Sequence, residues 1–169
     1  MQILKKALMG LLLVPFGMAT SSADDSEALF STTNLNLETA QELANAALLN
    51  CREQGYQVAV AVVDRSGILQ VSLRDRFAGP HTPETARRKA WTAVSFRTNT
   101  QELVEVTQSG QAQSGVRFVT EALVIGGGVM VEAAGSMVGA IGVSGAPGGD
   151  IDEACAVKGI EAIEDKIAF

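Results

Sequence analysis

The sequence is poor in the residues from which metal sites and nucleophilic active sites are built. It contains one histidine, His81, and two cysteines, Cys51 and Cys155, among 169 residues. A zinc site with several histidines is therefore excluded, and the two distant cysteines cannot form a Cys-x-x-Cys cluster. A serine nucleophile would have to use His81, but residues 142–146 read Gly-Val-Ser-Gly-Ala and miss the last glycine of the G-x-S-x-G motif. We assign no catalytic residue and expect a binding protein rather than an enzyme.

Positive charge is also scarce. The chain has 13 lysines and arginines against 19 acidic side chains, which gives a net charge of −6. Its one basic cluster is the tripeptide Arg87-Arg88-Lys89. Nucleic-acid binding requires clustered lysines and arginines that neutralise many phosphates. We therefore expect no nucleic-acid partner.

The N-terminus has the features of a signal peptide. Lys5 and Lys6 precede an apolar run at residues 7–18, and residues 21–23 read Ser-Ser-Ala, the small-residue pattern of a cleavage site. The alternative is a membrane anchor, but the run is shorter than the roughly 20 apolar residues of a span and is interrupted by Pro15 and Gly17. The pattern favours export.

Export sets the expected domain organisation. Residues 1–23 would be the signal peptide, and residues 24–169 would form a single domain, periplasmic or secreted, with no membrane span. Because residues 1–23 contain two lysines and no acidic residue, the remaining domain has a net charge of −8. In an oxidising compartment paired thiols usually form a disulfide, which favours a Cys51–Cys155 bridge over the alternative of two separately buried thiols.

Periodicity and turn residues predict the elements of the first half of the domain. Asn36 can cap a helix with an apolar stripe that ends at Gly55. Residues 56–63 and 68–74 form a hairpin, and the apolar run 58–63 is typical of a strand covered on both faces. Thr82, as a cap, and Pro83 begin a second helix, which runs to about Arg97.

The second half is expected to complete an α+β fold. In chain order it contains a short helical segment, a loop, an apolar stretch, a glycine triplet, a hairpin and a last helix, at residues 101–108, 108–115, 119–125, 126–128, 129–143 and 150–167. Asp150 would cap the last helix, and Asp152 would lie in its first turn, where the helix dipole favours acids. The resulting prediction is a two-layer α/β arrangement with a mainly antiparallel, five-stranded sheet flanked by helices.

His81 is the candidate ligand residue because it precedes a helix N-terminus. The helix dipole there disfavours an imidazolium and leaves a neutral nitrogen that can coordinate iron. The same helix amides can hold a carboxylate or propionate, and nearby arginines can donate to it: Arg74, Arg76, Arg87 and Arg88. The alternative is a solvent-facing loop histidine.

Two other segments invite functional interpretations that the sequence does not favour. Residues 144–149 are rich in glycine and precede a helix, but no Gly-Lys-Ser/Thr follows and the next residues are acidic, so a tight turn that could line a pocket is the better interpretation. Met130 and Met137 lie on predicted strands, where core packing is the default and haem ligation the exception.

Four sequence blocks resemble signature segments of a known family. They are Val-Ala-Val-Val-Asp-Arg-Ser-Gly at 60–67, Ala-Gly-Pro-His-Thr at 78–82, Ala-Arg-Arg-Lys-Ala at 86–90 and Val-Gly-Ala-Ile-Gly-Val-Ser-Gly at 138–145. In this order they resemble the GlcG/HbpS (haem-degrading domain) family. The resemblance implies an antiparallel sheet flanked by helices, assembly into homo-oligomers and, for some members, haem binding. Where many members have Gly-Gly-x-Pro-Ile, residues 127–131 read Gly-Gly-Val-Met-Val, which puts ligand choice in question if this strand edge shapes the pocket.

The leading functional hypothesis is an exported protein that binds or senses haem. His81 is its candidate iron ligand, and Arg76, Arg87 and Arg88 are the candidates for binding the propionates. The first alternative is binding or turnover of a small carboxylate such as glycolate at the same helix end. The second is a non-catalytic, oligomeric interaction module.

Overall fold

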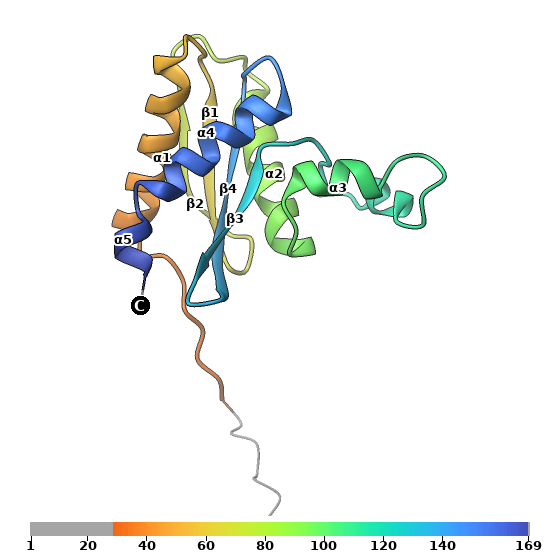
Figure 1. Cartoon of the computed structure of the whole chain (residues 1–169), viewed down its shortest axis with the longest axis horizontal. Coiled ribbons are helices and arrows are strands. Elements are labelled where there is room, and N and C mark those ends of the chain that lie inside the picture. The colour runs from red at the N-terminus through yellow and green to blue at the C-terminus, as the bar shows by residue number, and fades with distance from the viewer. Residues whose placement is uncertain (1–28, 169) are drawn as a thin grey trace, which may run out of the picture. The chain divides into compact units, whose positions relative to one another are not determined.

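One antiparallel sheet organises residues 29–168, the part of the chain that the computed structural model describes. Within that part its four strands are β1 (Ala59–Asp64), β2 (Leu69–Arg74), β3 (Gly128–Ala133) and β4 (Ser136–Ser144), in the order β2-β1-β4-β3 (Figure 1). Both predicted hairpins are confirmed, since β1 pairs with β2 and β3 with β4. The predicted signal peptide, residues 1–23, lies outside the described residues.

The prediction of five strands is wrong, because the apolar stretch 119–125 is a loop. Its backbone carbonyls at Thr120, Glu121 and Ala122 accept hydrogen bonds from the guanidinium of Arg88. The Leu123 amide donates to Thr92 Oγ1 at 2.8 Å. Buried backbone polar groups need partners, and here side chains of a helix supply them in place of a neighbouring strand.

The helices largely follow the expected order. They are α1 (Leu37–Glu53), α2 (Thr82–Phe96), α3 (Thr100–Val106), α4 (Gly149–Glu161) and α5 (Glu164–Ile167), with a 3₁₀ helix at Ser114–Phe118. Among residues 29–168, no helix has both the length and the apolar character needed to cross a bilayer.

Helix ends are where local prediction fails. Asn36 caps α1 as expected, accepting from the Thr39 amide at 2.8 Å. Thr82 does not cap α2, because it is the first helical residue and its hydroxyl donates to Gly79 O at 2.8 Å. Asp150 does not cap α4 either, since Gly148 occupies the cap position. The predicted last helix is two helices, interrupted between Glu161 and Glu164.

Helices cover both faces of the sheet, so the expectation of two layers is also wrong. Helices α1 and α4 lie together on one face, and α2 lies on the other (Figure 1). Along β1 and the residue before it, successive side chains alternate between these faces. Val58, Val60 and Val62 join the core beneath α1 and α4, whereas Ala59, Ala61 and Val63 pack beneath α2. The apolar run 58–63 is thus buried on both sides, as its sequence predicted.

Helix α2 lies unusually close to β4. A Cβ atom at Gly142 would stand 2.0 Å from the carbonyl oxygen of Ala86, so no other residue fits there without moving the helix. Small residues on both sides of this contact let the α2 backbone rest directly on the strand. The approach brings the first turns of α2 to the end of β4, where Ser144 and the glycine-rich segment begin.

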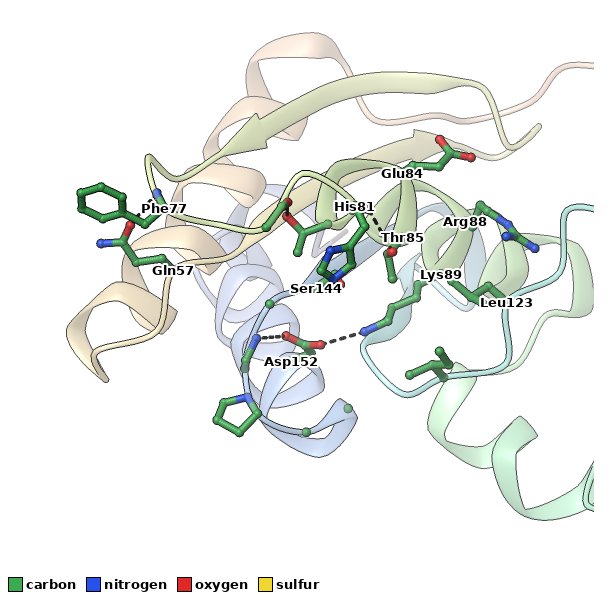
Figure 2. A pocket seen from close by; sticks show the side chains of 18 residues that line it. Gln57, Phe77, His81, Glu84, Thr85, Arg88, Lys89, Leu123, Ser144 and Asp152 are labelled. Carbon is green, nitrogen blue, oxygen red and sulfur yellow. Dashed lines mark hydrogen bonds and ion pairs between the residues drawn. The ribbon is translucent and has the colours of Figure 1, made fainter.

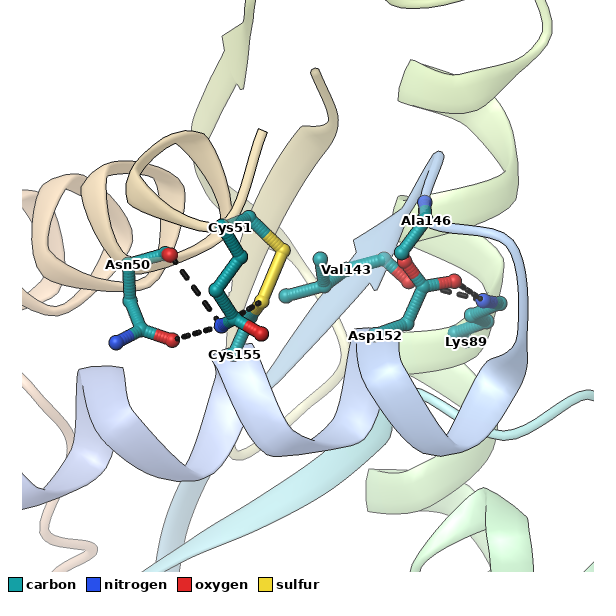
Figure 3. The surroundings of a disulfide bond; sticks show 8 residues. Asn50, Cys51, Lys89, Val143, Ala146, Asp152 and Cys155 are labelled. Atoms are coloured by element: carbon teal, nitrogen blue, oxygen red, sulfur yellow. Dashed lines mark hydrogen bonds and ion pairs between the residues drawn. A yellow bond between two sulfur atoms is a disulfide. The ribbon is translucent and has the colours of Figure 1, made fainter. Parts of the chain in front are cut away.

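A disulfide bond joins α1 to α4 (Figure 3). It links Cys51 and Cys155, whose Cα atoms are 5.5 Å apart and whose side chains are fully buried. The structure therefore confirms the bridge that the sequence favoured over two free thiols. It closes a loop with a sequence separation of 104 residues, which constrains the unfolded chain strongly.

Removing this bridge should destabilise the protein. A Cys51→Ala/Cys155→Ala variant should lose about 2–5 kcal/mol of unfolding free energy, because a loop of this length restricts the denatured ensemble. Urea denaturation followed by circular dichroism measures the loss. A reductant should lower the stability of the wild-type protein towards that of the variant and leave the variant unchanged. Equal stabilities of wild type and variant would contradict the assignment.

Candidate functional site

A cleft of about 550 Å³ opens where α2 and α4 both begin (Figure 2). Its volume falls within the roughly 300–1,000 Å³ typical of small-molecule sites. The loop before α2, the glycine-rich segment 144–149 and the end of the 119–125 loop surround it. The apolar part of its lining is formed by Phe77, Leu123, Ile125, Ala146 and Pro147.

His81 stands at this cleft, at the cap position of α2, as the sequence predicted. Its side chain is exposed and makes no capping hydrogen bond. A Cβ atom at Gly79 would lie 2.7 Å from His81 Cε1 and 3.0 Å from Nδ1, so the absent side chain at Gly79 makes room for the ring. In Figure 2 the imidazole extends from the start of α2 into the cleft. The ring can therefore meet a ligand without breaking an internal bond.

The loop that holds His81 is fixed by three contacts. Arg52 Nε donates to Asp75 Oδ2 at 2.8 Å, the Phe77 amide donates to Gln57 Oε1 at 2.9 Å, and the Arg74 guanidinium donates to Ala78 O. Asp75 is buried, and the hydrogen bonds from Arg52 and from the Arg76 amide hold the pKa of its carboxyl below the ordinary value. The Arg52 contact ties the histidine loop to the end of α1.

A buried ion pair forms the floor of the cleft. Lys89 Nζ, on α2, lies 2.8 Å from Asp152 Oδ2, on α4, and donates to Val143 O at 2.9 Å. Asp152 Oδ1 accepts from the Ala146 amide at 3.0 Å. Lys89 is 1 % exposed and Asp152 3 %, and burial lowers the pKa of the amine and raises that of the carboxyl, against their mutual attraction. The pair joins α2, β4 and α4 at one point (Figure 3).

Only an indirect signal for this pair is present in the sequence. Asp152 fits the first turn of a helix, and Lys89 belongs to the basic cluster, so each has a sufficient local explanation. Lys89 nevertheless lies between Ala86 and Ala90 on the buried stripe of α2, where a lysine is anomalous. That anomaly indicates a buried partner but does not identify Asp152.

The structure brings His81 together with one of the predicted arginines. Arg88 lines the cleft, but its guanidinium already donates to the carbonyls of the 119–125 loop, with distances of 2.9–3.2 Å. Arg87 pairs with Glu84 and Glu121 at 2.6 Å each and is not part of the lining. Arg76 is exposed and also lies outside the lining. The described cleft therefore offers fewer arginine donors than the sequence suggested.

The strand that departs from the family pattern, residues 127–131, does not line this cleft. Met130 and Met137 pack against the buried residues of α2 and β4, which confirms that they belong to a core cluster. The lining instead contains Ser144, part of the segment 144–149 that was predicted from the sequence to be a tight turn able to line a pocket.

Removing one member of the buried pair should be costly. Lys89→Met leaves the Asp152 carboxylate without its counter-charge, and about 3–5 kcal/mol of unfolding free energy should be lost. The double variant Lys89→Met/Asp152→Asn should recover part of this loss, because no uncompensated charge remains and the amide oxygen still accepts from Ala146. Urea denaturation at pH 7 measures both variants. A loss below about 1 kcal/mol in the single variant would show that the pair does not anchor the helices.

The Asp75–Arg52 contact should make stability depend on pH. The folded pKa of Asp75 is depressed, so its contribution is complete above the ordinary carboxyl pKa of about 3.9 and is lost as the pH falls through the folded pKa. Asp75→Asn should therefore be less stable than wild type at pH 7, and the difference should shrink in acid. The exposed Asp165→Asn variant serves as the control. A difference that is constant with pH would contradict the ion-pair explanation.

Comparison with known proteins identifies the family to which this chain is similar. The family model described as "Haem degrading protein HbpS-like" matches residues 35–161. The corrinoid adenosyltransferase PduO of Citrobacter freundii is 32% identical over 114 residues, which cover 66% of this chain and 34% of PduO. The chain thus spans about a third of the length of that relative.

Solved structures agree with the sequence comparison. The crystal structure of HbpS is 40% identical, with a TM-score of 0.76, and the match covers 80% of this chain and 94% of that one. The crystal structure of a PduOC:heme complex is 31% identical, with a TM-score of 0.72 and coverage of 78% and 96%. These matches confirm the resemblance found in the sequence blocks. The chain belongs to the family of HbpS-like haem-degrading proteins.

Proposed function

We propose that this chain is a small-ligand-binding protein that holds haem in the cleft, with His81 as the iron ligand. The observation that supports this most strongly is the His81 ring, which enters the cleft free of any capping hydrogen bond. His81 is also the single histidine of the sequence. A relative of the same fold is described as a haem complex, which supports the choice of ligand.

The lining residues fit such a group. Haem is a flat, largely apolar ring system with carboxylate arms. Phe77, Leu123 and Ile125 offer apolar contacts for the ring, and Phe77 is 79 % exposed, so it gains burial from any ligand that covers it. Bound haem would supply an iron centre with redox and ligand-binding chemistry. The chain's own part is to hold the iron through His81 and to shield the ring with its apolar walls.

The proposal also includes the cellular compartment of the protein and its oligomeric state. The predicted signal peptide directs the protein to the periplasm or the exterior, and the Cys51–Cys155 disulfide is of the kind that persists in oxidising compartments. A homo-oligomer would cover part of the large exposed apolar side chains, among them Phe118, which is 88 % exposed. Size-exclusion chromatography with light scattering measures the assembly.

Titration of haemin into the protein tests the function. The sample must lack a polyhistidine tag, because His81 is the only histidine and a tag would bind iron itself. Wild type should give a saturable Soret band at one haemin per chain, and His81→Ala should lose or shift it. Arg76→Ala, in the same loop but outside the lining, is the matched control and should behave as wild type. An unchanged band in His81→Ala would remove His81 from the role.

A further inference from the structure

Ser144 is a buried side chain whose polar group faces the cleft. It is the last residue of β4, is 5 % exposed and belongs to the lining. Its backbone pairs with Ala59, and its hydroxyl takes part in none of the side-chain hydrogen bonds found within residues 29–168. A buried hydroxyl without an internal partner is available to a ligand.

The N-terminus of α4 adjoins this hydroxyl. Gly148 and Gly149 line the cleft, α4 begins at Gly149, and no side chain caps the helix. The first intrahelical bond of α4 is donated by the Asp152 amide to Gly148 O, at 3.1 Å. The amides before it have no carbonyl partner inside the helix, as at every helix start, and the helix dipole places partial positive charge there.

Two of the acids around this corner are paired with cations. Asp152 is balanced by Lys89, at 2.8 Å, and Glu84 at the rim is paired with Arg87. The other acids of the first turn of α4 are not part of the lining. Asp150 is exposed, and its Oδ1 lies near Gly148, since a Cβ atom on that glycine would stand 2.3 Å from it. Glu153 accepts a hydrogen bond from the Gly127 amide at 3.4 Å.

We propose that Ser144 and the first amides of α4 form a subsite for the carboxylate group of the ligand. The hydroxyl and the amides donate, and a carboxylate accepts several such bonds at once. Arg88 is not needed, since its guanidinium already serves the 119–125 loop. The placement of the ligand rests on the proposed function, but the chemistry of the subsite does not. A haem propionate and a small free acid would use the same donors.

Haemin and haemin dimethyl ester, whose carboxylates are blocked, distinguish these sources. Ser144→Ala should weaken haemin binding about tenfold or more, the size expected for a hydrogen bond to a charged group, and leave ester binding unchanged. The exposed Ser136→Ala, at the other end of β4, is the control. Because no internal bond is lost, Ser144→Ala should keep the wild-type melting temperature. Equal effects on haemin and ester, or none on haemin, would overturn the subsite while haem binding stands.

A second arm keeps the subsite testable if the proposed function fails. If wild type binds neither haemin nor its ester, thermal shift with glycolate and longer carboxylic acids decides, since a ligand of the folded state raises apparent stability. A shift in wild type that Ser144→Ala loses and Ser136→Ala keeps supports the carboxylate subsite with a free acid as ligand. No shift with any of these acids overturns it.

Discussion

The ion pair between Lys89 and Asp152 is the contact on which the arrangement of the cleft depends. A lone buried charge costs several kcal/mol, so two buried charges are tolerated only where each meets the other and its remaining polar partners. Val143 O and the Ala146 amide complete this set, which fixes α2, the end of β4 and the start of α4 in one relative position. Lys89 follows His81 by eight residues on α2, about 12 Å of helix. The ion pair at the floor of the cleft therefore also fixes the position of His81 at the rim.

Small residues make this anchor possible. A Cβ atom at Gly128 would stand 2.4 Å from Lys89 O, and one at Gly142 would stand 2.0 Å from Ala86 O. With larger residues α2 would be lifted from the sheet, and the lysine amine could not reach both Val143 and Asp152. The alanines and glycines of this layer thus do more than fill space. They hold a charged helix close enough to the sheet for its lysine to be paired.

Features that depend on local sequence pattern could be predicted, whereas features set by contacts between residues far apart in the sequence could not. The stripe of α1, the two hairpins and the doubly covered strand β1 follow from periodicity, and the disulfide followed from the inferred compartment. The stretch 119–125 has the composition of a strand, but its carbonyls accept hydrogen bonds from Arg88 instead of from a neighbouring strand. The local sequence contains no sign of this contact. Asp152 looks like an ordinary acid at a helix start, because its partner lies 63 positions away. His81 was found because its site is local, a helix end, whereas Ser144 is significant only beside α4 and the cleft.

Two helix N-termini converge on the cleft, and this favours a ligand with two kinds of polar group. At α2 the exposed imidazole of His81 offers a nitrogen as an electron-pair donor, while at α4 free amides favour an anion. Between them lie Phe77, Leu123 and Ile125, which a two-carbon acid would leave in water within a cleft of about 550 Å³. Full burial of one such side chain contributes about 1.5–3 kcal/mol, as much as a charged hydrogen bond. A ligand with an apolar body, a metal centre and a carboxylate arm satisfies all three parts of the lining, and a small free acid satisfies only one.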